Sequence, residues 1–336
     1  MEISKQIIRK LQHSSGLFVA APIEETGYNK VWLRDNIYEA MALEVLGDVI
    51  NLKKVYHALF DIFLKHEYKL DYAIKIKPQY AHQYIHARYN IETLDEFWDE
   101  WGNKQNDSIG LFLFKVGELE DKGIIILRDQ NDVRILEKLV QYLKSIEYYK
   151  EPDHGIWEEH DELHSSSIGA CVAGLKSISR IIDVENELIE KGLKTLEALL
   201  PRESNSKESD LALLSLIYPF NIVNANIKNK ILINIEKNLV KKKGVIRYIG
   251  DKYYYKNGEA EWPLGLIWLA LIYKKLGDKK KYLGYMKKVK LSRNAKGEFP
   301  ELYYSNSDIH NENSPLGWAQ ALYLVLLLEK ENGIRR

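Results

Sequence analysis

Two kinds of apolar helical pattern alternate along this chain, and the alternation limits the folds that are open to it. In residues 51–67 and 130–148, apolar side chains recur at three- and four-residue spacing on one face only. In residues 264–273 and 318–328, nearly every position is apolar. A helix with one apolar face lies at a surface, whereas a helix that is apolar all round is buried all round. The alternation therefore predicts outer and inner helices that take turns.

The same patterns predict an all-α chain. We expect helices at residues 3–14, 35–48, 51–67, 105–119, 130–148, 165–183, 185–200, 208–218, 224–240, 260–276, 278–290 and 314–331. Connections that enter the inner helices are mostly long, and those that leave them are mostly short, so the long loops gather at one end. This arrangement predicts an (α/α)6 barrel that forms a single domain over residues 1–336. Residues 68–104 form the longest irregular segment, and its many aromatic residues argue against disorder.

Charge and cysteine content exclude several classes of function. Lys+Arg and Asp+Glu both number 48, so nothing favours a nucleic-acid partner or an acidic membrane surface. The single cysteine, Cys171, allows neither an intrachain disulfide nor a cysteine-based metal site. The N-terminus has no signal-peptide pattern, and no segment is long and apolar enough to span a membrane. We therefore expect a cytoplasmic protein, with its oligomeric state, a homo-oligomer included, left open.

Acidic clusters precede five of the inner helices, and four of them contain a tryptophan. The clusters lie at residues 32–35, 101–107, 157–159, 259–263 and 301–315. Acids at these positions are also common as helix caps or dipole partners, and Asp35 and Asp107 fit that role as well. Helix caps do not need a neighbouring tryptophan, however, and aromatic rings suit carbohydrate. The pattern predicts a sugar pocket at one rim of the barrel.

Two glutamates are the candidates for glycosidic-bond hydrolysis. Burial beside Trp157 raises the pKa of a carboxyl group such as Glu158, so that it keeps a proton to donate near neutral pH. Glu301, from a distant loop at the same rim, is the candidate base. Inversion needs these two carboxyls to lie about 6.5–9.5 Å apart, with room for water. We also expect Arg34 to keep the adjacent Asp35 ionised. No metal or other cofactor is required.

The ordered motifs resemble those of the glucoamylase family, glycoside hydrolase family 15. They are Trp-Leu-Arg-Asp-Asn, Trp-Gly-x-x-Gln-x-Asp, Trp-Glu-Glu, Glu-Trp-Pro-Leu and Pro-Glu-Leu, and they span most of the chain. They are closest to the branch that the family shares with the α and β subunits of phosphorylase kinase. Larger relatives usually carry an N-terminal β-sandwich before the barrel, and we expect this chain to contain the barrel alone.

The resemblance implies an inverting exo-acting hydrolase that releases glucose from the non-reducing end of an α-linked glucan or oligosaccharide. It assigns the general acid to Glu158 and the general base to Glu301. The substrate-binding residues that it implies, or that lie within its motifs, are Trp32, Arg34, Asp35, Arg88, Trp101, Gln105, Asp107, Trp157, Glu159, Arg247 and Trp262.

Two other classes of protein are alternatives to such a hydrolase. The kinase subunits are regulatory, so a catalytically silent glucan-binding or regulatory protein is the alternative. Terpene cyclases and prenyltransferases also use this barrel, but they need an Asp-rich cation site or a Cys/His zinc site, and neither is visible in the sequence. Maltose, isomaltose and trehalose types of substrate all stay open.

Overall fold

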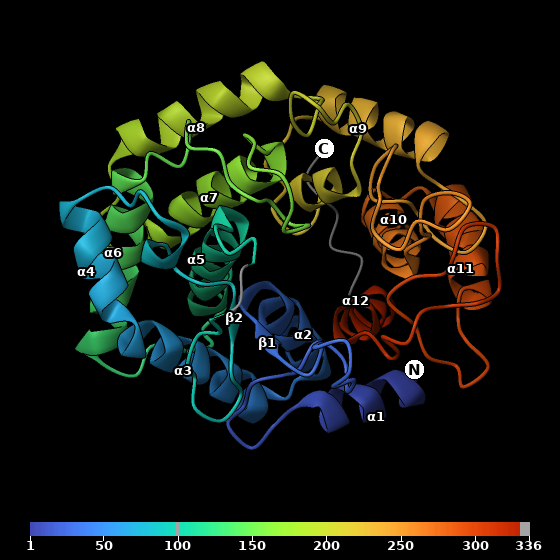
Figure 1. The fold of residues 1–336 in the computed structure, drawn as a ribbon, viewed down its shortest axis with the longest axis horizontal. Coiled ribbons are helices and arrows are strands. Elements are labelled where there is room, and N and C mark those ends of the chain that lie inside the picture. Colours follow the sequence, from blue (N-terminus) through green and yellow to red (C-terminus); the bar gives the residue numbers. More distant parts are fainter. Residues whose placement is uncertain (99–100, 330–336) are drawn as a thin grey trace.

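A computed structural model describes residues 1–98 and 101–329, and its helices form two concentric rings (Figure 1). The inner ring contains α2 (Leu33–Leu46), α5 (Asn106–Asp121), α7 (Ser165–Ile178), the 3-10 helix η2 (Leu211–Leu216), α10 (Pro263–Lys275) and α12 (Gly317–Leu328). The outer ring contains α1 (Glu2–Leu11), α3 (Val49–Lys65), α6 (Gln130–Ser145), α8 (Asn186–Leu199), α9 (Ala225–Asn238) and α11 (Lys279–Leu291). This is the (α/α)6 barrel that the alternating patterns predict.

Contacts between neighbouring inner helices close the ring. Along the chain α2 packs on α5, α5 on α7, α7 on η2, η2 on α10 and α10 on α12, and α12 returns to α2. The inner helices α10 and α12 are buried along nearly their whole length, as their uninterrupted apolar sequences predict. The core of the molecule therefore lies between the two rings and among the inner helices.

Two elements differ from the expected ones. Within residues 208–218, where an α-helix is expected, only Leu211–Leu216 are helical, and they form the 3-10 helix η2. Asp210 caps η2 by accepting from the backbone N–H of Ala212. Within the segment expected to be irregular, Glu67–Lys75 form a further helix, α4, which packs on α6 outside the outer ring. The chain bends at His66, so the apolar face of α4 starts again with Leu70 and Ala73.

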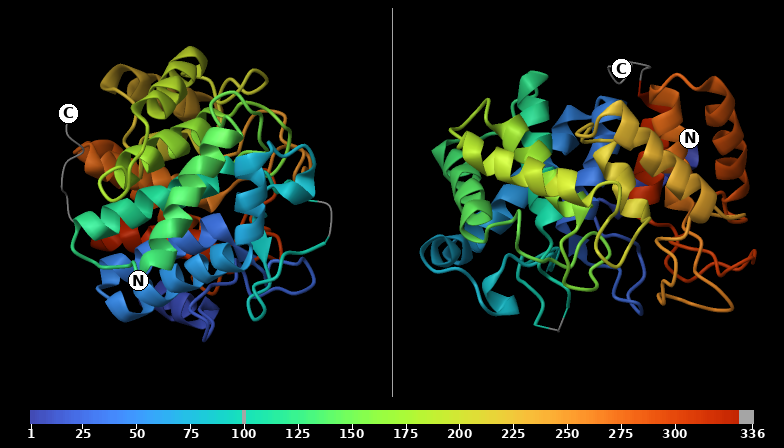
Figure 2. Two further views of the ribbon diagram at one scale, coloured as in Figure 1. Left: turned by 90° about the vertical axis from the view of Figure 1, so that its left-hand side faces the viewer. Right: turned by 90° about the horizontal axis from the view of Figure 1, so that it is seen from above.

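Short strands and long loops gather at one end of the barrel (Figure 2, right). Strands β1 (Val31–Trp32) and β2 (Arg88–Tyr89) pair antiparallel, with Trp32 opposite Arg88. The 3-10 helix η1 (Ala81–Gln83) lies between α4 and β2 along the chain. Because the inner helices begin at this end, residues just before them meet there. Among the described residues, no helix has the length and apolar composition needed to cross a bilayer.

Candidate active site

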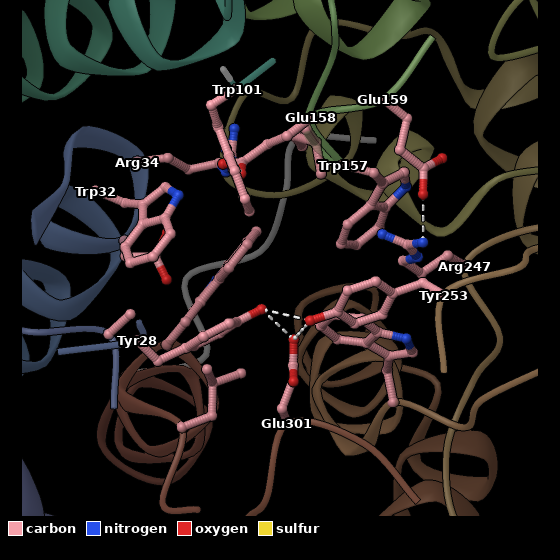
Figure 3. Close-up of a pocket in the computed structure, with 16 residues that line it drawn as sticks. Tyr28, Trp32, Arg34, Trp101, Trp157, Glu158, Glu159, Arg247, Tyr253 and Glu301 are labelled. Atoms are coloured by element: carbon pink, nitrogen blue, oxygen red, sulfur yellow. Dashed lines mark hydrogen bonds and ion pairs between the residues drawn. The ribbon is translucent and has the colours of Figure 1, made fainter. Parts of the chain in front are cut away.

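A small cavity opens where the inner helices begin, and acidic and aromatic side chains line it (Figure 3). Its volume is about 190 Å³, below the roughly 300–1,000 Å³ typical of sites for drug-sized ligands. The lining residues are Ala20, Tyr28, Trp32, Arg34, Asp35, Trp101, Ile156, Trp157, Glu158, Glu159, Arg247, Tyr253, Trp262, Glu301, Leu316 and Trp318. A cavity of this size, walled by indole rings, suits the end of a sugar chain more than its middle.

Glu158 enters the cavity from a strained loop. Its backbone lies in the left-handed region, with φ of 62°, which few residues other than glycine adopt and which is enriched at functional sites. Its Oε1 accepts from Nη2 of Arg34 at 3.0 Å, and its Oε2 accepts from Nε1 of Trp101 at 2.5 Å. The loop packs closely on Gly102, where a Cβ would lie 2.5 Å from the Glu158 carbonyl oxygen. The conformation of Glu158 is thus fixed by its neighbours.

Burial raises the pKa of the Glu158 carboxyl above its ordinary value. The positive charge of Arg34, the Trp101 hydrogen bond and the charge of Arg88 act in the opposite direction, and burial outweighs them. A buried carboxyl with one wall of indole keeps its proton to a higher pH than a solvated one. Glu158 therefore has the environment that a proton donor needs.

Arg34 is held by partners other than the expected Asp35. Its Nη1 donates to Gln105 and Asp107, each at 3.0 Å, and its Nη2 donates to Glu158. Successive residues on a helix point in different directions, so Arg34 and Asp35 at the start of α2 do not face each other.

The expectation that Arg34 keeps Asp35 ionised is wrong. Burial raises the pKa of Asp35 to about 7. The charge of Arg34 lowers this pKa, and the carboxyls of Glu158 and Glu301 raise it further. Asp35 faces the cavity, where its state of protonation changes near neutral pH.

Four donors surround the carboxyl of Glu301 on the other side of the cavity. Figure 3 shows two of them, the hydroxyls of Tyr28 and Tyr253. Its Oε1 accepts from the hydroxyls of Tyr28 and Tyr253, the latter at 3.1 Å. Its Oε2 accepts from the amides of Asn311 at 2.5 Å and Asn313 at 2.8 Å. Burial raises the pKa of Glu301, and the hydrogen bonds of Tyr28 and the two asparagines partly offset that rise.

A third charged group lies along the wall between these two carboxyls. Arg247 donates to Glu159 at 2.5 Å, and a second carboxylate, Asp251, accepts from its Nε at 2.7 Å. The guanidinium carbon of Arg247 lies 5.3 Å from the ring centre of Trp157 and 5.5 Å from that of Trp262. The arrangement offers both donors and acceptors beside two indole rings, which suits a ligand with many hydroxyls.

Three of the expected substrate-binding residues lie behind the cavity wall. Gln105 and Asp107 contact Arg34 from behind, so they hold a lining residue without lining the cavity themselves. The guanidinium carbon of Arg88 lies 3.7 Å from the ring centre of Trp101 and 5.5 Å from that of Trp32. Their positions make them supports for Arg34 and the tryptophans.

The other ten predicted residues all line the cavity, and the structure adds several more. The additions with polar or aromatic side chains are Tyr28, Tyr253 and Trp318. Tyrosine is frequent in this chain, with 22 copies, so no single one stands out in the sequence. Among the described residues, no group of three His, Cys, Asp or Glu side chains is placed to hold a metal ion.

Comparison with known proteins connects the chain to one family. The model of glycosyl hydrolases family 15 matches residues 2–194. Among curated proteins, the chain is 26% identical to the probable phosphorylase b kinase regulatory subunit alpha of Caenorhabditis elegans over 88% of its length. It is 28% identical to the liver isoform of that subunit from Mus musculus over 89%. In both cases the chain spans only 30% of the relative's length.

Solved structures share the fold. A wild-type glycosidase superposes with a TM-score of 0.83 at 20% identity, covering 97% of this chain and 94% of that one. A glycosidase variant in complex with glucose gives a TM-score of 0.84 with the same coverage of both chains. A bacterial glucoamylase complexed with acarbose gives a TM-score of 0.70 at 18% identity, over 97% of this chain and 54% of that one.

Proposed function

The chain belongs to glycosyl hydrolases family 15, and on that premise we propose that it is an inverting exo-acting glycoside hydrolase. Its substrate would be an α-linked glucan or oligosaccharide, from which it releases glucose at the non-reducing end. The observation that carries the proposal is that Glu158 and Glu301 line one cavity from opposite sides, each in an environment suited to a different role (Figure 3).

Glu158 acts as the general acid. It protonates the glycosidic oxygen as the bond to the terminal sugar breaks, because burial keeps its carboxyl protonated to a higher pH than usual. Arg34 and Trp101 orient the carboxyl before the reaction. After proton transfer they also stabilise the carboxylate that remains, since both donate hydrogen bonds to it.

Glu301 acts as the general base. An ionised carboxylate has about four lone-pair positions, and protein donors fill them in this structure. The contact from Tyr253, at 3.1 Å, is the longest of those to Glu301, so a water molecule displaces it most readily. Such a water lies between Glu301 and the sugar, where the base removes its proton as it attacks the anomeric carbon.

The remaining lining residues bind the terminal sugar. Asp35 accepts hydrogen bonds from sugar hydroxyls, and Arg247 with Glu159 offers a donor and an acceptor on the next part of the wall. The rings of Trp32, Trp157 and Trp262 exclude water and contact the C–H faces of the sugar. Contacts that strengthen in the transition state lower the barrier, so these residues support catalysis as well as binding.

A silent glucan-binding or regulatory protein is the second candidate. The observation in its favour is that the curated relatives from Caenorhabditis elegans and Mus musculus are named regulatory subunits. Such a protein would keep the cavity and bind sugar without hydrolysing it. The two candidates therefore differ in turnover, and the test must measure binding and turnover separately.

The deciding experiment supplies maltose, isomaltose and trehalose to the purified protein and follows both free glucose and its anomer by NMR. From maltose or isomaltose the hydrolase releases the terminal glucose as the β-anomer. From trehalose it gives one β- and one α-glucose, because the leaving sugar keeps its configuration. Glu158→Gln is expected to lose most activity on sugars with poor leaving groups. It should lose less on α-glucosyl fluoride, because fluoride needs little protonation in order to leave. Glu301→Gln is expected to fail on both, because each reaction needs an activated water.

Two results would contradict the proposal in different ways. Release of the terminal glucose of maltose or isomaltose as the α-anomer would exclude inversion, and with it the roles given to Glu158 and Glu301. Sugar binding by calorimetry with no turnover in the wild type would instead establish the regulatory candidate. The variant Glu92→Gln removes an exposed carboxyl outside the cavity and controls for general effects of the substitution.

A further inference from the structure

The loop that carries Glu158 is closed at its base, and the side chain of a buried histidine packs against it. Asp153 and Glu162 pair antiparallel at the base, with N–O distances of 2.8 and 3.0 Å. His164 follows as the N-cap residue of α7. Its ring lies against Gly155, where a Cβ would come within 2.9 Å of the ring atom Cδ2. The ring therefore contacts the loop just before Glu158.

A second contact of the same ring lies just after Glu158. Nε2 of His164 lies 3.2 Å from the backbone carbonyl oxygen of His160. A carbonyl oxygen only accepts, so Nε2 is the donor in this pair. Between the two contacts, the backbone N–H of Glu158 donates to the carbonyl of Gly155 at 3.3 Å. His164 thus contacts the loop on either side of the carboxyl that the proposed mechanism uses as the acid.

The other ring nitrogen of His164 faces a buried carboxyl group. Nδ1 lies 3.4 Å from Oε1 of Glu203, and the two residues are only 3% and 1% exposed. Glu203 is itself fixed, because the backbone N–H and the hydroxyl of Ser166 donate to its two oxygens at 3.2 and 2.5 Å. A neutral imidazole donates from one nitrogen only. Because an acceptor lies opposite each nitrogen, the site fits His164 as an imidazolium, and the ion pair joins the loop to the first turn of α7.

Titratable groups on two segments surround the His164 ring. They are Asp153, His154 and Glu162 on the loop, and Glu203 and Lys207 before η2. Burial lowers the pKa of His164, but the hydrogen bond from Glu203 and the charges of Asp153 and Glu203 outweigh it and raise this pKa to about 9. The raised pKa lies above the unfolded value, so the stabilising contribution is full below the unfolded pKa and is lost as pH rises through about 9.

We propose that the His164 imidazolium positions the general acid by holding the loop of Glu158 to the fixed carboxylate of Glu203. This inference rests on the proposed function. The backbone of Glu158 lies in the left-handed region, a conformation that persists only where the surroundings enforce it. Arg34 and Trp101 orient the carboxyl, whereas His164 holds the backbone on both sides of it. His164 does not line the cavity, so it is a positioning residue, and without it the loop relaxes away from the glycosidic oxygen.

The test compares His164→Gln with the wild type on maltose and on α-glucosyl fluoride. Loss of the held loop is expected to lower kcat for maltose about ten- to a hundredfold, the effect of a misplaced catalytic group. KM should change little, because the lining residues are untouched. The loss on α-glucosyl fluoride should be smaller, because fluoride needs little protonation in order to leave.

His57→Gln is the matched control. Nε2 of His57 also lies 3.2 Å from a backbone carbonyl oxygen, that of Ile126, but His57 is on α3, outside the cavity. A purely stabilising role of His164 would lower kcat for both substrates by the same factor, because it would reduce only the fraction of folded protein. The ratio of the two rates therefore measures the position of the acid and not the stability of the fold.

Glu203→Gln is the second variant, and it decides the case if His164→Gln does not fold. Glutamine keeps the size of Glu203 and an acceptor for Ser166, but it removes the charge that faces His164. The ratio of the two rates should change in the same direction and by less. NMR of protein with 15N-labelled histidine should show both ring nitrogens of His164 protonated at neutral pH in the wild type, and a lower pKa of the ring in Glu203→Gln.

Hydrogen exchange separates this inference from the proposed function. In His164→Gln, the amides of residues 155–160 are expected to exchange faster than in the wild type, whereas His57→Gln should leave them unchanged. If no sugar is hydrolysed but the ring is doubly protonated and the exchange increases, the hydrolase proposal fails and the holding of the loop by His164 stands. If turnover occurs and His164→Gln lowers kcat equally for both substrates, the inference is overturned while the hydrolase stands. A neutral His164 ring in the wild type would also overturn it.

Discussion

The carboxyl of Glu301 depends on tyrosine hydroxyls that come from two other loops. Tyr28 precedes α2, Tyr253 follows Arg247, and both donate to the same oxygen. Because a hydrogen bond to the ionised form favours that form, both contacts lower the pKa of Glu301 against the rise that burial causes. The ionisation of Glu301, the proposed base, therefore depends in part on residues that carry no charge themselves.

Replacing Tyr28 by phenylalanine removes one of these two hydroxyls. Tyr28→Phe is expected to lower kcat about tenfold, the effect of losing a charge-assisted hydrogen bond of ~1.5 kcal/mol. The change also raises the pKa of Glu301, so the acid limb of the pH–rate profile moves to higher pH. Tyr253→Phe is the matched control, with a smaller shift because its contact is longer. An acid limb that stays in place in Tyr28→Phe would contradict this account.

Asp35 is expected to help binding and to reduce stability. Its pKa, raised by burial to about 7, lies above the unfolded value, so its stabilising contribution is full below the unfolded pKa and is lost as pH rises through about 7. At pH 8, Asp35→Asn should therefore increase the free energy of unfolding by roughly 2–4 kcal/mol. The same change should lower kcat/KM for the smallest substrate, because Asn cannot replace an ionised acceptor.

Urea unfolding at pH 5 and pH 8, together with steady-state kinetics, checks this prediction. The stability difference between Asp35→Asn and the wild type should be smaller at pH 5 than at pH 8. Equal differences at both pH values would show that Asp35 is ionised throughout. An unchanged kcat/KM would reduce Asp35 to a dipole partner in the first turn of α2.

Sequence patterns identify the two candidate catalytic carboxyls of the site, but they do not identify all of the residues around them. Glu158 and Glu301 stand out because each lies in an acidic motif before a buried helix. Tyr28 and Tyr253 give no such signal, since their role emerges only when separate loops meet at Glu301. Adjacent charges such as Arg34 and Asp35 suggest a pair, but the direction of side chains on a helix decides otherwise.

Helices α5 and α7 cross at glycines. A Cβ on Gly110 would lie 2.4 Å from the Ala170 carbonyl carbon on α7, and a Cβ on Gly174 would lie 2.4 Å from the Gly110 carbonyl oxygen. The two backbones therefore approach more closely than helices with larger side chains allow. This close crossing sets the separation between the loops that carry Trp101 and Glu158, because those loops lead into α5 and α7.

Adding a methyl group at this crossing tests its importance. Gly110→Ala is expected to destabilise the protein by about 1–3 kcal/mol through overpacking. Gly284→Ala is the control, because Gly284 lies on the exposed face of α11 with open space around it. That control should stabilise the helix by about 0.5–1 kcal/mol through propensity alone. Equal effects of the two substitutions on urea unfolding would show that α5 and α7 can separate at little cost.

Apolar periodicity in the sequence predicts the long helices correctly and fails for the short ones. The inner and outer helices are recovered with ends that differ by a few residues. Helix α4 is missed because Glu67–Lys75 is only nine residues long and carries exposed tyrosines, Tyr68 and Tyr72, which are typical of a loop. The 3-10 geometry of η2 is missed as well, since its continuous apolar sequence fits either helix type.

The first and last described helices of the molecule pack on each other, beside the α12–α2 contact that closes the inner ring. Helix α1 buries Ile7, Ile8 and Leu11, and it packs on α12. The hydroxyl of Ser4 donates to the side chain of Gln320 at 2.9 Å, across nearly the full length of the chain. Because each inner helix depends on its neighbours on both sides, we expect residues 1–329 to unfold as a single unit.

Removing residues 1–11 tests that expectation. Burying each of the three apolar side chains contributes about 1.5–3 kcal/mol, and their sum is comparable to the ~5–15 kcal/mol that stabilises a typical domain. The shortened chain should therefore lose its cooperative transition in scanning calorimetry or show a much lower Tm. Lys10→Ala, on the exposed face of α1, is the control and should change little. An unaltered single transition in the shortened chain would show that the rest of the barrel does not depend on α1.

The alternation of helix types predicts this ring from sequence, because burial on all sides leaves few arrangements for six apolar helices. The path of residues 76–98 over the rim of the barrel has no such signal in the sequence, because neither periodicity nor motifs describe such loops.

The division of the site between the two halves of the ring has a practical consequence. Arg34, Trp101 and Glu158 come from the first half of the chain, whereas Arg247 and Glu301 come from the second. A cut at the exposed connection near Glu185, between α7 and α8, would give two fragments with one carboxylate of the proposed pair each. If the proposed hydrolysis holds, neither fragment could cleave a glycosidic bond alone, and activity would return only on reassembly. Fused to two other proteins, such fragments would report by glucose release whether those proteins meet.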